Sequence, residues 1–377
     1  MRSETVIIGG GIVGLSIAYY LATMGHKDLV LVEQNYLGSG GTFRCATGIR
    51  ASFTTEEHIV LLRESINLWK ELSEKLNFFY SRSGYVWLLR TEEQLKAFTE
   101  YSKIHNKYGV PTRIVQPEEI KELVPTINTN GIIGGLHDPL AGKADPFEAV
   151  LSLAKAIRSM GAKICTQTRV EKIIVENNKV KGVKTSIGEI ESSNVVIAAG
   201  YGSRELARTV GINLPLKNVP RHALVTEKFR EVFKPLVIDW TTSSYIVQTH
   251  AGTFLIGADV EEEPDSPATQ RIDYIPRAVR IMVKLFPWLK HVNILRYWTG
   301  YYVMSPDRHP ILGPLENITG LYVATGFSGH GFMMAPIVGK VLAEWIIDGK
   351  PSIPQAERLS FERIKLGKLI EEKAVFG

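Results

Sequence analysis

At the start of the chain, short apolar runs alternate with a segment in which apolar residues recur at helical spacing. Residues 6–8 and 29–32 are wholly apolar runs, which are typical of buried parallel strands. Between them, residues 12–24 place apolar side chains at helical spacing, and Gly25 follows the last of these positions. The order of strand, helix and strand predicts a βαβ unit at the N-terminus.

The same alternation returns after residue 145. Asp145 is a favourable N-cap, and Pro146 suits the first turn of the helix that follows. The expected elements are helices at 147–160 and 336–347, buried strands at 163–166, 195–200 and 321–326, and a hairpin of 170–176 with 179–185. We therefore expect one Rossmann-type domain that is assembled from three separate pieces of sequence.

The intervening segments show a different pattern. Residues 34–53 form a loop that is rich in glycine, serine and threonine, and residues 215–300 lean towards strands. Further strands are expected at 84–90, 131–137, 245–248 and 253–257, and further helices at 58–76, 92–107, 117–123 and 275–286. The predicted fold class is α/β (α+β overall), with a mixed-sheet domain inserted into the Rossmann-type domain.

The turn after the first strand carries a glycine motif. Gly9, Gly11 and Gly14 form G-x-G-x-x-G, in which the three glycines allow a tight turn, the approach of a pyrophosphate and close packing of the helix on the strand. Glu33 ends the second strand, where an acid can bond a ribose hydroxyl. An ordinary βαβ unit would leave this spacing to coincidence. The acid disfavours NADP, but the motif does not separate NAD from FAD.

Composition narrows the class of protein. The chain has 377 residues, 45% hydrophobic and 22% charged, which fits a globular protein of two domains. The net charge of +5 is spread along the sequence and does not argue for nucleic acid. Only Cys45 and Cys165 are present, which excludes a disulfide framework and fits a reducing, cytoplasmic interior. We expect no integral membrane segment, no signal peptide and no metal site from these spacings.

Three distant segments carry a resemblance to a known family. They are the glycine motif, the block 298–313 and the block 320–332, which contains Gly329-His330-Gly331-Phe332. Together they resemble the D-amino-acid oxidase-type group of FAD-dependent amine oxidoreductases, over nearly the whole chain. Within that group the segments 38–45, 142–147 and 329–336 are most similar to the β subunits of sarcosine oxidase and of archaeal dye-linked L-proline dehydrogenases.

The resemblance implies FAD as the cofactor, with its pyrophosphate over the glycine motif and its ring system above the turn 326–331. The cofactor-binding residues that it implies are Gly9, Gly11, Ile12, Val13, Gly14, Glu33, Gln34, Gly41, Thr42, Arg44, Cys45, Thr47, Val170, Ala199, Gly200, Gly300, Gly326, Ser328, Gly329, His330, Gly331, Phe332 and Met333. Related oxidases attach FAD through a cysteine late in the chain. Both cysteines here lie in the first half, so we expect FAD to be held non-covalently.

The same resemblance assigns the segments to domains. Residues 1–77, 145–214 and 318–351 are expected to form the FAD-binding domain. Residues 78–144 and 215–317 are expected to bind the substrate, and residues 352–377 to form a C-terminal extension.

Four residues are candidates for the catalytic site. A small amino-acid substrate carries a carboxylate, which arginine binds best. Arg50 lies in a segment where the related monomeric oxidases place an arginine beside the flavin, and Arg296 precedes the block 298–313. His330 lies in the flavin-facing turn, and Tyr301, with Tyr302 beside it, can form a wall of the site. The competing interpretations are an ion-paired surface arginine, a histidine that only fills a turn, and core aromatic residues.

The resemblance favours a heteromeric dehydrogenase over a self-contained oxidase. Monomeric sarcosine-type oxidases have a lysine where this chain has Met333. Heteromeric relatives pair with an α subunit and hold a second flavin, FMN, at the subunit interface near the position of Arg221 and His222. His250 is a weaker candidate for the site, and His137 and His291 have no supporting context.

The expected function is therefore that of a catalytic β subunit that oxidises a secondary amino acid, L-proline first and sarcosine next. Electrons are expected to pass to a partner or to an acceptor other than NAD, which allows a peripheral association with a membrane. A stand-alone amine or glycine oxidase and a D-amino-acid dehydrogenase are the nearest alternatives. A non-catalytic flavin-binding subunit is an alternative of another class, and an NAD-dependent dehydrogenase is more distant.

Overall fold

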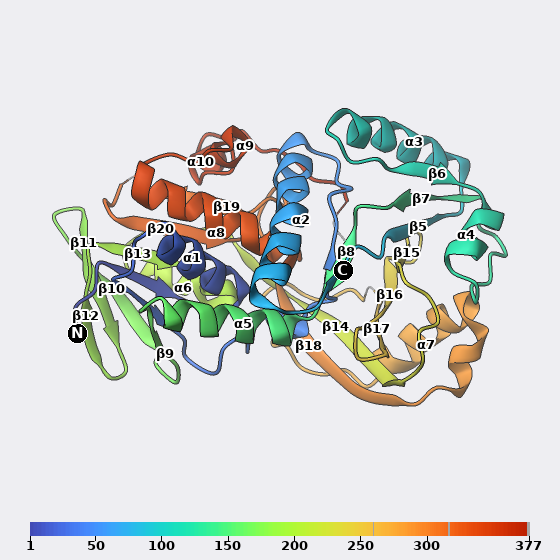
Figure 1. The fold of residues 1–377 in the computed structure, drawn as a ribbon, viewed down its shortest axis with the longest axis horizontal. Helices are drawn as coiled ribbons and strands as arrows, with labels where there is room; N and C mark the ends of the chain where they lie inside the picture. Colours follow the sequence, from blue (N-terminus) through green and yellow to red (C-terminus); the bar gives the residue numbers. More distant parts are fainter. Residues whose placement is uncertain (259, 316, 375–377) are drawn as a thin grey trace.

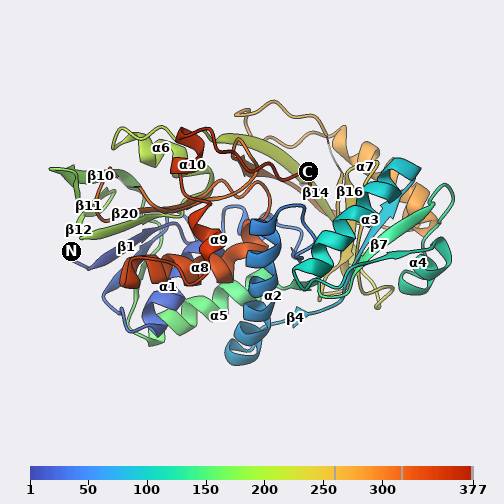
Figure 2. The same ribbon diagram turned by 90° about the horizontal axis from the view of Figure 1, so that it is seen from above.

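The computed structural model describes residues 1–258, 260–315 and 317–374. The last three residues of the expected C-terminal extension, 375–377, lie outside them. Two large sheets lie at opposite ends of the molecule, and the long helix α2 (Glu56–Leu76) stands between them in both views (Figure 1, Figure 2).

The first sheet has six strands in the order β19-β20-β13-β1-β2-β9. Its strands are β1 (Thr5–Ile8), β2 (Leu29–Val32), β9 (Lys163–Cys165), β13 (Asn194–Ile197), β19 (Ile311–Pro314) and β20 (Leu321–Thr325). All neighbours pair in parallel except β19, which runs antiparallel to β20 at one edge. This is the Rossmann-type sheet that the sequence predicts, although β19 comes from residues 215–317, which are expected to bind the substrate.

Both faces of this sheet are covered, as its wholly apolar strands require. Ile7 packs under one layer of helices, and Val6 and Ile8 face the opposite layer. The first layer holds α1 (Ile12–Thr23), α2, α5 (Pro146–Ser159) and α8 (Gly331–Asp348). The second layer holds α6 (Ser203–Arg208) and a three-stranded sheet of β10 (Val170–Glu176), β11 (Lys179–Thr185) and β12 (Gly188–Glu191).

The second large sheet is mixed and has eight strands in the order β18-β14-β17-β16-β15-β5-β7-β6. These strands are β5 (Tyr85–Leu89), β6 (Arg113–Val115), β7 (Gly134–Asp138), β14 (Lys217–Lys228), β15 (Leu236–Asp239), β16 (Ser244–Gln248), β17 (Thr253–Ala258) and β18 (Ile294–Met304). Helix α7 (Tyr274–Leu285) packs on one face and α3 (Glu92–Lys107) on the other. The long strands β14 and β18 pair along their length, from Lys217–Met304 to Thr226–Ile294.

Short elements complete the chain. A three-stranded sheet joins β3 (Gly48–Ile49), β8 (Gly142–Ala144) and β4 (Tyr80–Ser81). The remaining helices are α4 (Pro117–Leu123), α9 (Pro354–Glu357) and α10 (Glu362–Lys365), with short 3-10 turns at Thr42–Arg44, Gly200–Gly202 and Pro287–His291. In the described residues, no helix combines the length and apolar character needed to cross a membrane.

One predicted helix begins at a different residue. The sequence predicts a helix at 336–347, after a glycine-rich turn. Helix α8 instead begins at Gly331, so Pro336 lies inside it. Ser65 Oγ and Trp69 Nε1 of α2 donate to the carbonyl oxygen of Met333, at 2.6 and 3.1 Å, and so tie the first turn of α8 to α2. The early start brings the flavin-facing turn directly onto the helix N-terminus.

Candidate active site

A cavity of about 810 Å³ runs from the carboxyl ends of β1 and β2 to the inner face of the eight-stranded sheet. This volume lies within the range of cofactor and ligand sites. Its walls come from the glycine motif, the loop at 39–50, the turn at 324–333 and strands β14, β15, β16 and β18. The long axis of the cavity thus joins the nucleotide-binding sheet to the inserted sheet.

The glycine motif forms the first end of this cavity. Gly9 has a φ of +117°, and a Cβ atom there would lie 2.3 Å from the carbonyl oxygen of Ala198. A Cβ atom on Gly14 would lie 2.0 Å from the carbonyl oxygen of Gly9, so this glycine lets α1 pack on β1. Gly11 is the N-cap residue of α1. Its backbone is extended, and it has no side chain that could cover the helix N-terminus. The open N-terminus of α1 therefore faces the cavity, as a phosphate site requires.

Polar groups hold this end in shape. Glu33 accepts hydrogen bonds from the backbone N–H groups of Gly10, at 2.7 Å, and Asn35, at 2.8 Å. Thr42 Oγ1 accepts one from the N–H of Ile12 at 3.0 Å. Each carboxylate oxygen of Glu33 keeps further lone pairs, and the side chain lines the cavity, so it can accept from a ribose hydroxyl.

The turn between β20 and α8 forms the middle of the cavity. Gly326, Ser328 and Gly329 have φ values of +71°, +50° and +93°. A Cβ atom on Gly329 would lie 2.5 Å from the ring of Tyr302, so only glycine fits between the turn and β18. Because these residues line the cavity, the backbone of the turn lies close to whatever occupies it.

His330 follows the turn and is 4% exposed. Its ring meets the rings of Phe53 at 4.6 Å and His58 at 5.1 Å, both edge-on. Burial, with the charge of Arg50, lowers the pKa of His330 well below 6.5, so the imidazole is neutral at pH 7.

The far end of the cavity is bounded by the inserted sheet. Arg221 of β14 lines it, and the Arg221 guanidinium lies 5.8 Å from the centre of the Tyr302 ring. Tyr245 of β16 and Tyr85 of β5 also line it, and burial raises the pKa of both phenols. Nε of Arg221 is buried and has no hydrogen-bond partner among the described residues. This end therefore offers an arginine donor inside an aromatic wall.

Arg50 lies at the same end but is held more firmly. It is 4% exposed and donates to the carbonyl oxygens of Ser52, at 2.5 Å, and Ala374, at 2.6 Å. Its guanidinium stacks 3.6 Å from the Phe53 ring centre and 4.8 Å from that of Trp87. Burial lowers the pKa of Arg50 to about 10, so it remains charged at pH 7. Arg50 is thus a buried cation on the cavity wall with two of its donors in use.

Most of the residues expected at the site line this one cavity. Arg50, His330 and Tyr301 do so, together with all the expected cofactor-binding residues except Gly14, which lies beneath the motif. Arg296 is exposed, pairs with Val225 near the far end of β18 and does not line the cavity. The geometry therefore does not support Arg296 as a catalytic residue, because the cavity is lined by residues 299–303 of β18 and Arg296 lies three residues before them.

The other histidines also lie apart from the cavity lining. His222 is buried and contacts Glu262 at 2.8 Å and Thr299 at 2.9 Å. His250 stacks on Phe79 with ring centres 3.9 Å apart.

Several lining residues were not singled out from the sequence. Tyr85, Ser244 and Tyr245 come from strands without a motif, and they meet only because β5, β15 and β16 are neighbours in the sheet. No local feature of the sequence marks them, since alternating apolar strands carry such residues on both faces.

The comparisons with known proteins agree with this geometry. Residues 4–345 match the DAO family of FAD dependent oxidoreductases. The chain belongs to this family. It is therefore an FAD-dependent oxidoreductase, and the glycine cradle, Glu33 and the tight turn at 326–329 fit an extended FAD.

The chain is similar to known proteins along its whole length. It is 28% identical over 383 residues to the sarcosine oxidase subunit beta of Rhodobacter capsulatus, covering 100% of this chain and 92% of the relative. It is 30% identical to the sarcosine oxidase subunit beta of an Arthrobacter species, covering 98% and 93%. The solved structure of L-proline dehydrogenase from P. horikoshii matches with 38% identity and a TM-score of 0.95, covering 98% of this chain and 99% of that one.

Proposed function

We propose that this chain is the catalytic, FAD-binding subunit of a dehydrogenase that oxidises secondary amino acids, with L-proline as the preferred substrate and sarcosine next. The observation that carries the proposal is the likeness to L-proline dehydrogenase, at 38% identity and a TM-score of 0.95 over nearly the whole of both chains. The similar sarcosine oxidase proteins are named as β subunits, which supports a partner α subunit for this chain.

The residues of the cavity suit this reaction in two ways, by binding a carboxylate and by contacting a small apolar ring. When bound, FAD supplies the acceptor for two electrons and for the hydrogen on the carbon next to the amine. We infer that Arg221 and Arg50 bind the substrate carboxylate, because both lie at the end bounded by the inserted sheet and arginine pairs well with carboxylates. Tyr245, Leu236 and Ile238 line the same end and supply an apolar contact for a small ring and exclude water from it.

The proposed function is tested by anaerobic reduction. The purified chain, loaded with FAD, is mixed without oxygen with L-proline, sarcosine, D-proline or glycine, and flavin absorbance is followed. We expect L-proline to bleach the flavin fastest and sarcosine next. A chain that no amino acid reduces would overturn the proposal. Rapid formation of hydrogen peroxide in air would instead favour the stand-alone oxidase, to which glycine oxidase from Bacillus cereus adds weight with 26% identity and a TM-score of 0.85.

The pH dependence of the reduction gives a separate prediction. Burial lowers the pKa of His330 well below 6.5 and raises those of Tyr85 and Tyr245, so all three groups stay neutral from about pH 7 to about pH 9. The reactive substrate is the neutral amine. We therefore expect the reduction rate at low substrate concentration to rise about tenfold per pH unit in this interval, set by substrate ionisation.

Stopped-flow reduction with L-proline checks this profile, with His330→Gln beside the unchanged protein. The variant removes the titratable ring but keeps a polar group of similar size. An equal slope in both is expected. A plateau near neutral pH in the unchanged protein, absent from the variant, would show that His330 does titrate.

A further inference from the structure

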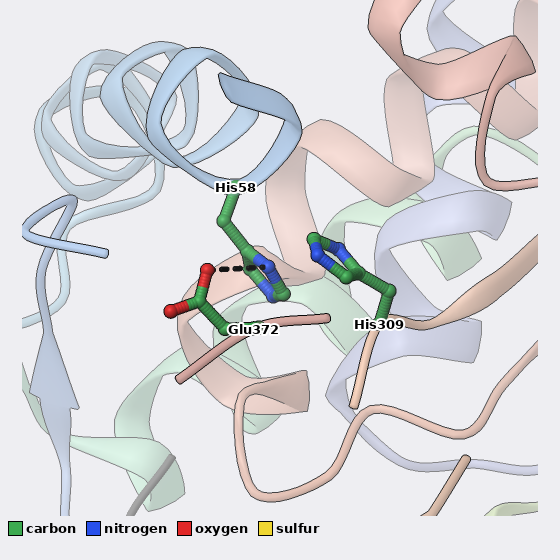
Figure 3. A group of neighbouring side chains, drawn as sticks. All are labelled: His58, His309 and Glu372. Carbon is green, nitrogen blue, oxygen red and sulfur yellow. Dashed lines mark ion pairs between the residues drawn. The ribbon is translucent and has the colours of Figure 1, made fainter. Parts of the chain in front are cut away.

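Three buried side chains of metal-binding type meet behind His330. They come from distant segments: His58 from the first turn of α2, His309 from the loop before β19, and Glu372 from the C-terminal extension. One nitrogen of each histidine and one carboxylate oxygen all lie within 4.8 Å of one another. In Figure 3 the His58 ring stands between the carboxylate and the His309 ring, and all three point into the same interior space. All three side chains are 0% exposed.

Three ring nitrogens of this cluster lack partners. Among the described residues, both ring nitrogens of His58 and Nδ1 of His309 have no hydrogen-bond partner. The dashed line in Figure 3 joins His58 Nδ1 to Glu372 Oε2 at 3.6 Å, which is too long for a hydrogen bond. An unpaired buried polar atom is costly, and three in one interior space are rare in folded proteins. A bound group that accepts lone pairs from both histidine rings would compensate this cost.

The protonation state of the rings suits a cation rather than an anion. Burial, with the charges of Arg50 and Arg363, lowers the pKa of His58 to about 3, and burial lowers the pKa of His309 well below 6.5. Both imidazoles are therefore neutral at pH 7 and present lone pairs, as metal binding requires.

We propose that His58, His309 and Glu372 bind one divalent transition-metal ion, for which Zn²⁺ is the best fit. Two imidazoles and one carboxylate are a common zinc ligand set. With metal–ligand bonds near 2.1 Å, tetrahedral ligands lie about 3.4 Å apart. The 3.6 Å between His58 Nδ1 and Glu372 Oε2 already matches this separation.

The surroundings hold the carboxylate in place. Glu372 accepts hydrogen bonds from the backbone N–H groups of Thr54 and Thr55, at 2.9 and 3.1 Å, and from both threonine hydroxyls, at 2.6 and 2.7 Å. Such outer contacts fix the orientation of metal ligands. His309 Nε2 also lies 3.2 Å from the Thr55 hydroxyl, which leaves Nδ1 of that ring for the ion.

Nearby cations are largely compensated. Arg363 pairs with the buried Asp307 through contacts of 2.8 and 2.9 Å. Arg50 is close enough to Asp138 and Glu372 for both carboxylates to raise its pKa. Carboxylates therefore balance the positive charges of the two arginines near the cluster, which reduces their repulsion of an incoming cation.

The position of the ion suggests a structural role for it. It would join the C-terminal extension to the first turn of α2, directly behind the ring of His330, whose centre lies 5.1 Å from that of His58. His330 lines the cavity, so the ion would stiffen the wall against which the flavin-facing turn rests.

Metal content is the decisive measurement. The full chain is purified without a polyhistidine tag, dialysed against metal-free buffer and analysed by plasma mass spectrometry. We expect about one zinc per chain, and at least a tenfold loss of zinc in His58→Ala and in Glu372→Gln. The exposed His291 supplies the matched control, because His291→Ala removes an imidazole far from the cluster and should leave the zinc unchanged.

A second measurement keeps the proposal falsifiable if a variant folds poorly. Protein stripped by a chelator is titrated with zinc chloride while its melting temperature is recorded, and crystals are examined for anomalous scattering at the zinc edge. We expect a zinc-dependent rise in melting temperature and a peak between the three side chains. The proposal is wrong if stripped protein shows no such rise. It is also wrong if crystals kept in excess zinc hold only water between the three side chains.

Discussion

Gly11→Val is expected to give a folded chain that no longer retains FAD. Gly11 has a φ of −76° and a ψ of 176°, which valine adopts readily. A Cβ atom there would meet only Thr42 Oγ1, at 3.2 Å, and the valine methyl groups would extend into the phosphate end of the cavity. We expect the dissociation constant for FAD to rise at least 100-fold, which corresponds to about 2.7 kcal/mol. The flavin-to-protein ratio after purification and a titration of the apoprotein measure it.

Gly202→Ala is the matched control for this change. Gly202 also lines the cavity, and a Cβ atom there would have its nearest neighbour at 4.0 Å, on Ala199. Circular dichroism should show the apo forms of both variants melting within a few degrees of the unchanged apoprotein. If Gly11→Val retained FAD normally, the FAD pyrophosphate would not lie over Gly11 as we expect.

Elements with strong local signals could be predicted closely from the sequence. Helix α3 runs over the expected residues 92–107, because Thr91 accepts from the N–H of Gln94 and so fixes its start. Helix α4 runs over the expected residues 117–123, with Pro117 in its first turn. The cofactor end of the cavity was predictable for the same reason, since the glycine motif and Glu33 lie within one βαβ unit.

The substrate end depends on contacts that local pattern does not encode. Arg221 lies opposite Gly300 only because β14 and β18 pair over a long register, and β15 then joins β5 in parallel. The meeting of His58, His309 and Glu372 also depends on contacts between distant segments. His58 and Glu372 stand more than three hundred positions apart, and their meeting depends on where the C-terminal extension crosses the start of α2. Spacing in sequence alone therefore predicted no metal site.

Arg50→Met is expected to have the largest combined effect on substrate reduction and stability. The change removes a buried guanidinium that donates to Ser52 and Ala374 and stacks on Phe53. Two buried carbonyl oxygens would lose their partners, at about 1–3 kcal/mol each, which lowers the melting temperature by about 5 °C for a chain of this size. If Arg50 also binds the substrate carboxylate, the reduction rate at low L-proline falls about 100-fold.

Arg221→Met separates the two contributions. Nη1 of Arg221 donates to the carbonyl oxygen of its own neighbour Pro220, at 3.1 Å, so little of the surrounding structure depends on this side chain. We expect Arg221→Met to weaken L-proline binding by a similar factor with little change in melting temperature, because it removes a charge-assisted bond to the substrate and few to the protein. Arg50→Lys should restore part of the substrate reduction, since it keeps the charge, but less of the stability, because an ammonium cannot span both carbonyl groups. Full substrate reduction by Arg50→Met, measured on its folded fraction, would leave Arg50 with a structural role alone and assign the carboxylate to Arg221.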